Sequence, residues 1–72
     1  MNNTVKKVEA DSVDKLQRIL GTFDENLNII MRELGVIIRV EGLTFVIEGV
    51  EERAVQAASV IESLLLLAEN AE

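Results

Sequence analysis

The residues best suited to chemistry in this chain lie between Gly21 and Asn26, where a glycine is followed by polar and acidic side chains. A glycine between two helices lets a ligand approach the backbone closely, and the N–H groups that open a helix attract anions. The string Thr22-Phe23-Asp24-Glu25 also fits a capping box, with Thr22 as N-cap and Glu25 at N3. These residues leave three interpretations open: a helix cap, a docking site for a protein, or a contact site for RNA.

The candidate contact residues are the polar and basic ones near this glycine, namely Lys15, Arg18, Gly21, Thr22, Asp24 and Asn26. Two adjacent carboxylates, Asp24 and Glu25, would repel a phosphate, so helix capping is the simplest interpretation of the segment. Phe23 fits a core or staple residue better than a stacking platform for a base.

No residue pattern predicts catalysis by this chain. It contains neither Cys nor His, which excludes thiol nucleophiles, zinc knuckles and imidazole bases. Glu51 and Glu52 are adjacent, so on a helix they diverge by about 100° and cannot work as a pair. None of the four glycines is followed by Lys-Ser or Lys-Thr, as an ATP-binding P-loop requires. We therefore expect a non-enzyme without a cofactor or metal of its own.

Length and charge predict one small domain. The 72 residues are 49% hydrophobic, mostly aliphatic, and form a single predicted domain whose ends, residues 1–3 and 70–72, are expected to fray. No apolar run approaches the ~20 residues that span a bilayer, and no signal sequence is recognisable, so a cytoplasmic location is expected. The net charge of −6 argues against a general nucleic-acid binder. The net charge of residues 1–35 is −1 (5 basic, 6 acidic), and that of residues 36–72 is −5 (2 basic, 7 acidic).

Hydrophobic periodicity predicts the element order β-α-α-β-β-α. A strand over residues 4–10 precedes a helix that begins after an N-cap at Asp11 or Ser12 and ends with Gly21 in the left-handed C′ position. Val13, Leu16, Ile19 and Leu20 form its predicted apolar stripe. A second helix ends at Gly35, and a hairpin then turns at Glu41-Gly42 and is closed by Gly49. A helix from residue 52 to about residue 70 completes an α+β domain, in which three helices cover one face of a three-stranded sheet.

The last helix is apolar over more than half of its circumference near its end, where Leu66 and Leu67 lie on the flank of the core face. A small sheet cannot cover so wide a surface. We expect Leu66 and Leu67 to form a docking surface, either for another domain or for a second copy of the chain.

The helix–glycine–helix corner and the element order resemble a KH domain of the eukaryotic type. Along nearly the whole chain, from about residue 8 to residue 68, the sequence is similar to the N-terminal segment of PhoH-like proteins. The features that carry this resemblance are Gly21, F-D-E-N-L at 23–27, L-G-V at 34–36, Gly49, Glu52, Ala57 and the leucines of 64–67.

The resemblance implies a cytoplasmic accessory domain of a P-loop ATPase associated with RNA metabolism, ribosomes and phosphate starvation. ATP and Mg²⁺ would be bound by a separate ATPase domain of the parent protein. This domain would position the parent on RNA, on the ribosome or on a protein partner, or would help it to oligomerise. The alternative is a KH-type module that binds single-stranded RNA weakly through the Gly21 corner.

Overall fold

The computed structural model describes residues 3–22 and 24–70, the side chains of residues 22, 24, 69 and 70 excepted. Six elements follow one another: β1 (Asn3–Glu9), α1 (Val13–Thr22), α2 (Asp24–Leu34), β2 (Ile37–Glu41), β3 (Thr44–Val50) and α3 (Glu51–Asn70). This confirms the predicted element order. Asn3 and Asn70, at the ends that were expected to fray, belong to β1 and α3.

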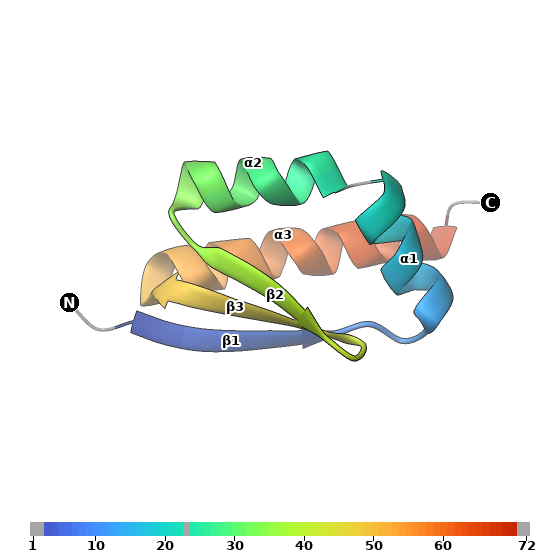
Figure 1. Cartoon of the computed structure of the whole chain (residues 1–72), viewed down its shortest axis with the longest axis horizontal. Coiled ribbons are helices and arrows are strands. Elements are labelled where there is room, and N and C mark those ends of the chain that lie inside the picture. Colours follow the sequence, from blue (N-terminus) through green and yellow to red (C-terminus); the bar gives the residue numbers. More distant parts are fainter. Residues whose placement is uncertain (1–2, 23, 71–72) are drawn as a thin grey trace.

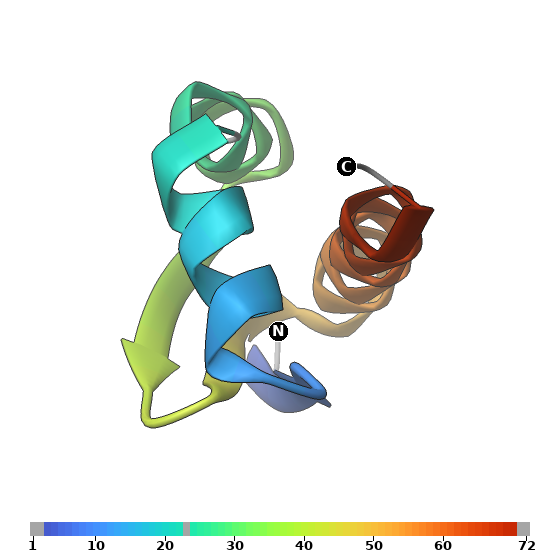
Figure 2. The same cartoon turned by 90° about the vertical axis from the view of Figure 1, so that its right-hand side faces the viewer.

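The three strands form one antiparallel sheet in the order β1-β3-β2. The helices lie on one side of this sheet, with α3 running along β1 and β3 and α2 lying above β2 (Figures 1 and 2). The opposite face of the sheet has no helix against it within the described residues. The predicted α+β architecture, with helices on one face of a three-stranded sheet, is therefore observed.

The core lies between the sheet and the helices. Phe45 and Ile47 of β3 meet Ile19 of α1 and Ile61 of α3, and none of these four side chains is exposed. Burial of each such side chain stabilises the fold by about 1.5–3 kcal/mol. Val46 points to the open face of the sheet, yet it is 4% exposed, because Lys7 and Arg39 flank it on the neighbouring strands.

Two glycines end their elements as the sequence predicted. Gly35 has a φ of +66°, and the N–H of Val36 donates to the Met31 carbonyl at 3.2 Å, which is the Schellman pattern at the end of α2. Gly42 has a φ of +63° and opens the two-residue turn between Glu41 and Thr44, the first position of a type II′ hairpin.

The other two glycines differ from the prediction. Gly21 does not adopt a positive φ and does not end α1, which runs on to Thr22. Thr22, the predicted N-cap of α2, is thus the last residue of α1. Gly49 does not close β3 but lies inside it, paired with Thr4. Val36 packs directly against the backbone there, which leaves no room for a side chain.

The predicted apolar stripe of α1 is only partly buried. Leu16 and Ile19 enter the core, whereas Val13 is 53% and Leu20 is 36% exposed. The helix packs mainly against α3, which contacts only one side of α1. Val13 and Leu20 lie beside that contact and are therefore exposed.

Candidate functional site

The corner between α1 and α2 presents backbone and acidic groups to solvent. Gly21 is exposed, and a Cβ placed on it would meet nothing within 4 Å. Glu25 and Asn26 are exposed in the first turn of α2. Phe23 and the side chains of Thr22 and Asp24 lie outside the described residues, so the predicted capping box and the predicted role of Phe23 are not tested. A ligand could reach the Gly21 backbone, and the exposed carboxylate of Glu25 follows four residues later in the chain.

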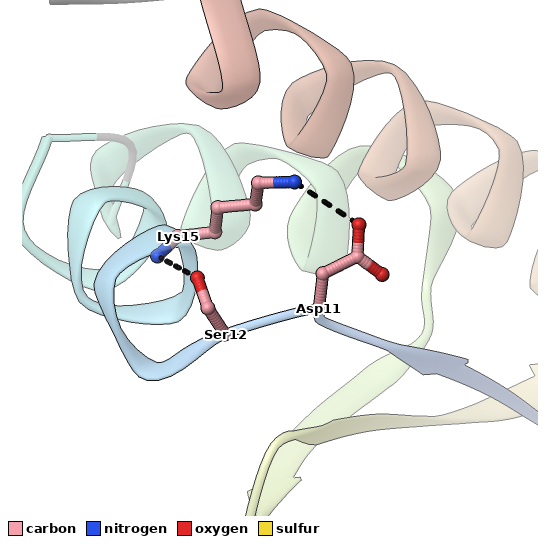
Figure 3. A network of polar contacts seen from close by, with 3 residues as sticks. All are labelled: Asp11, Ser12 and Lys15. Carbon is pink, nitrogen blue, oxygen red and sulfur yellow. Dashed lines mark hydrogen bonds and ion pairs between the residues drawn. The ribbon is translucent and has the colours of Figure 1, made fainter.

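The start of α1 is held by a cap and an ion pair (Figure 3). The N–H of Lys15 donates to Ser12 Oγ at 3.3 Å, which confirms Ser12 as the N-cap. The Lys15 ammonium donates to Asp11 Oδ2 at 3.0 Å. The Lys15 side chain is 20% exposed and that of Asp11 is 78% exposed, so this pair lies at the edge of the packed interior.

The predicted contact residues do not form one basic patch. Lys15 is six residues before Gly21, which is about 9 Å along a helix axis. Arg18 is exposed midway along α1, and Asn26 is exposed on α2. Arg32 lies in the last turn of α2, at the far end of that helix from the corner. Gly21 and Asn26 thus belong to the two helices that flank the corner, whereas Lys15 lies in the first turn of α1.

A groove of about 470 Å³ joins two residues that the sequence assigned to different surfaces. Lys15 lies on one side of this groove and Leu66 on the other. The groove runs between the end of β1, the start of α1 and the C-terminal half of α3. Its lining consists of Lys7, Val8, Glu9, Asp11, Lys15, Glu62, Leu65 and Leu66.

The outward side of α3 carries four exposed aliphatic side chains, which we term the outer α3 face: Val55, Val60, Leu66 and Leu67. Leu66 and Leu67 are 61% and 58% exposed, as the sequence predicted. Between the aliphatic residues lie two serines, and the Ser63 hydroxyl donates to the Ser59 carbonyl at 3.1 Å. Because this hydroxyl is satisfied within the helix, covering it would leave no unpaired donor.

The N-terminal half of the outer α3 face is hollowed. Val55 and Val60 line a second, shallow depression together with Leu34 of α2 and with Arg53, Gln56 and Ser59. Sequence reasoning missed this depression, because only the fold brings Leu34 beside α3. The one available signal was the aliphatic spacing of residues 55 and 60 on a polar side of the helix.

Within residues 3–22 and 24–70, no group of three or more acidic, histidine or cysteine side chains is placed to hold a metal ion. The helices in that part of the chain are also too short or too polar to cross a membrane. Comparison of the chain with protein-family models, with curated proteins and with solved structures finds no match.

Proposed function

We propose that this chain is a non-catalytic interaction domain of KH-like fold, which serves as the accessory domain of a PhoH-like ATP-binding protein. Two features support the proposal: the observed element order β-α-α-β-β-α and the direct succession of α1 and α2 at residues 22–24. Both are what the sequence resemblance implies. ATP and Mg²⁺ would then be bound by the ATPase domain of the parent protein, in the cytoplasm.

The observation that carries the proposal is the outer α3 face. Four exposed aliphatic side chains lie on this side of the helix, and the hydroxyl of the serine between them is already hydrogen-bonded within the helix. Burying these side chains against a partner removes apolar surface from water, which favours binding. The adjoining depression beside Leu34 gives this surface a concave part, into which an apolar side chain of a partner can insert.

We infer that the ATPase domain of the parent occupies this face. Linked domains commonly pack through interfaces of moderate area that contain both polar and apolar residues. A face with isolated aliphatic residues among serines suits such an interface. The interaction would hold the accessory domain in a fixed position, from which it directs the parent to RNA, to the ribosome or to a protein partner, or aids its oligomerisation.

Calorimetric titration of the chain with a separately produced PhoH-like ATPase domain tests this function. We expect saturable binding that Leu67→Glu abolishes, because the substitution places a charge in the apolar interface. Val13→Glu changes an aliphatic residue of similar exposure on α1 and should leave binding unchanged. No binding, or equal loss in both variants, would contradict the assignment of the face.

The alternative function is weak binding of single-stranded RNA at the α1–α2 corner. The observation in its favour is the open space around Gly21, which leaves the backbone accessible. Anisotropy titration with a single-stranded RNA at about 50 mM and about 200 mM salt separates the two functions. Saturable, strongly salt-dependent binding that Arg18→Glu weakens would favour the alternative. No change in anisotropy at high micromolar protein would exclude it.

A further inference from the structure

Among residues 3–22 and 24–70, strand β1 has a free edge, with which no other strand pairs. It lies at one side of the β1-β3-β2 sheet, and all seven of its residues are in register with β3, from Asn3 with Val50 to Glu9 with Thr44. In line with that register, the N–H of Ala10 donates to the Leu43 carbonyl at 2.8 Å. Bonded and non-bonded residues alternate along an antiparallel strand, so the N–H and C=O groups of Val5, Lys7 and Glu9 point to the free edge.

The groove described above opens along this edge. Three consecutive residues of β1, Lys7 to Glu9, line it. Successive side chains point to opposite faces of a sheet, so a hollow lined by three in a row must lie against the side of the strand. Leu65 and Leu66 of α3 form the facing wall of the groove. A strand added to β1 would therefore place an apolar side chain against these leucines.

The charges along the edge select the kind of strand that can pair with it. Within the described residues, neither Lys6 nor Lys7 forms an ion pair with a carboxylate, whereas Lys15 is paired with Asp11. Glu9 and Glu62 lie at the end of the groove next to α1. An extended segment that runs parallel to β1 complements this edge when it carries an acidic residue opposite Lys7, an apolar residue opposite Val8 at the groove, and a basic residue opposite Glu9.

We propose that β1 and its groove bind an extended, mixed-charge peptide segment of another protein, which adds a fourth strand to the sheet. Main-chain hydrogen bonds to Val5, Lys7 and Glu9 supply affinity, and the groove supplies side-chain specificity. A second copy of this chain is a poorer occupant, because antiparallel pairing of two β1 strands about their centre sets Lys6 opposite Lys6. This surface shares Leu66 with the outer α3 face but does not include Val55, Val60 or Leu67, and the proposal does not depend on the ATPase assignment.

Titration of the ¹⁵N-labelled chain with the blocked heptapeptide EVELKVK tests the proposal. We expect saturable shifts of the amide signals of β1 and of residues 62–66. Hydrogen exchange should slow by about tenfold or more at Val5, Lys7 and Glu9 and change little at Thr4, Lys6 and Val8, which already face β3. The peptide EVESKVK, which lacks the apolar anchor, should bind more weakly.

A matched pair of charge reversals completes the test. Lys7→Glu should weaken binding of EVELKVK by about 3–10-fold, whereas Arg53→Glu changes the net charge equally at a distant site and should not. The proposal would be overturned by the absence of shifts at millimolar peptide, by protection without the alternating pattern, or by equal weakening in both variants. Protection of the same edge amides in the free chain, with dimerisation in sedimentation, would assign the edge to a second copy.

Discussion

At the scale of single residues, some glycines are required by the local backbone conformation and another by tertiary packing. Gly35 and Gly42 adopt positive φ values, which the sequence predicted from their positions after a helix and within a hairpin. Gly49 has another reason to be glycine: a Cβ there would lie 2.7 Å from Val36 Cγ1 and 3.4 Å from the Val36 Cα. Only the folded sheet brings residues 36 and 49 together, so no local pattern could predict this role.

Gly49→Ala is therefore expected to destabilise the domain by about 1–3 kcal/mol, because the added methyl group overlaps a buried, β-branched side chain. Urea denaturation measures the change. The double variant Val36→Ala/Gly49→Ala should lose at least about 1 kcal/mol less than the sum of the two single variants. Simple additivity would show that Val36 and Gly49 do not contact each other.

Gly21→Ala is expected to have the opposite effect. Gly21 lies within α1, lacks a positive φ and has open space where its Cβ would be. Alanine there should raise the free energy of unfolding by about 0.5–1 kcal/mol, through better helix propensity. If thermal or urea denaturation shows a loss of similar size instead, Gly21 is the left-handed end of α1 that the sequence predicted.

At the scale of elements, α3 unites the core and the candidate docking surface. Ala54, Ala57, Ile61, Leu64 and Ala68 are buried on one side, and the outer α3 face lies on the other. Consecutive leucines thus have different roles, since neighbouring helix residues diverge by about 100°. Glu51 and Glu52 lie in the first turn, as predicted, where carboxylates complement the helix dipole.

Alanine at two leucines that are three residues apart, Leu64 and Leu67, should distinguish these roles. Leu64 is 8% exposed and Leu67 is 58% exposed. Leu64→Ala should lower the free energy of unfolding by about 2–5 kcal/mol, since it leaves a cavity in the core. Leu67→Ala should change it by no more than about 0.5 kcal/mol. Similar losses in both variants, measured by urea denaturation, would mean that α3 is rotated relative to this description.

The order and approximate limits of the elements could be predicted because each is encoded locally. Ser12 caps α1, Gly35 ends α2 and Gly42 turns the hairpin, and each of these signals involves only a few neighbouring residues. The candidate surfaces were predicted less completely. Leu66 and Leu67 follow from helical spacing, but the groove combines residues 7–9, 11, 15, 62, 65 and 66, which strand order and helix packing alone bring together.

At the scale of the whole molecule, the described residues carry three candidate surfaces, and two of them, the outer α3 face and the groove, share Leu66. The outer α3 face faces away from the sheet, the free edge of β1 lies beside the groove, and the α1–α2 corner is acidic where a phosphate would approach. We infer that this distribution suits a domain that joins proteins rather than one that binds RNA by itself. The α1–α2 corner then serves mainly to connect the two helices.

The most direct test of this account is an amide-resolved NMR titration of the ¹⁵N-labelled chain, first with a PhoH-like ATPase domain and then with single-stranded RNA. The account predicts that the ATPase domain shifts the signals of Val55, Val60 and Leu67, and that RNA shifts none at low salt. Saturable RNA-induced shifts at Gly21 and Asn26, with no response of the outer α3 face to the ATPase domain, would contradict it.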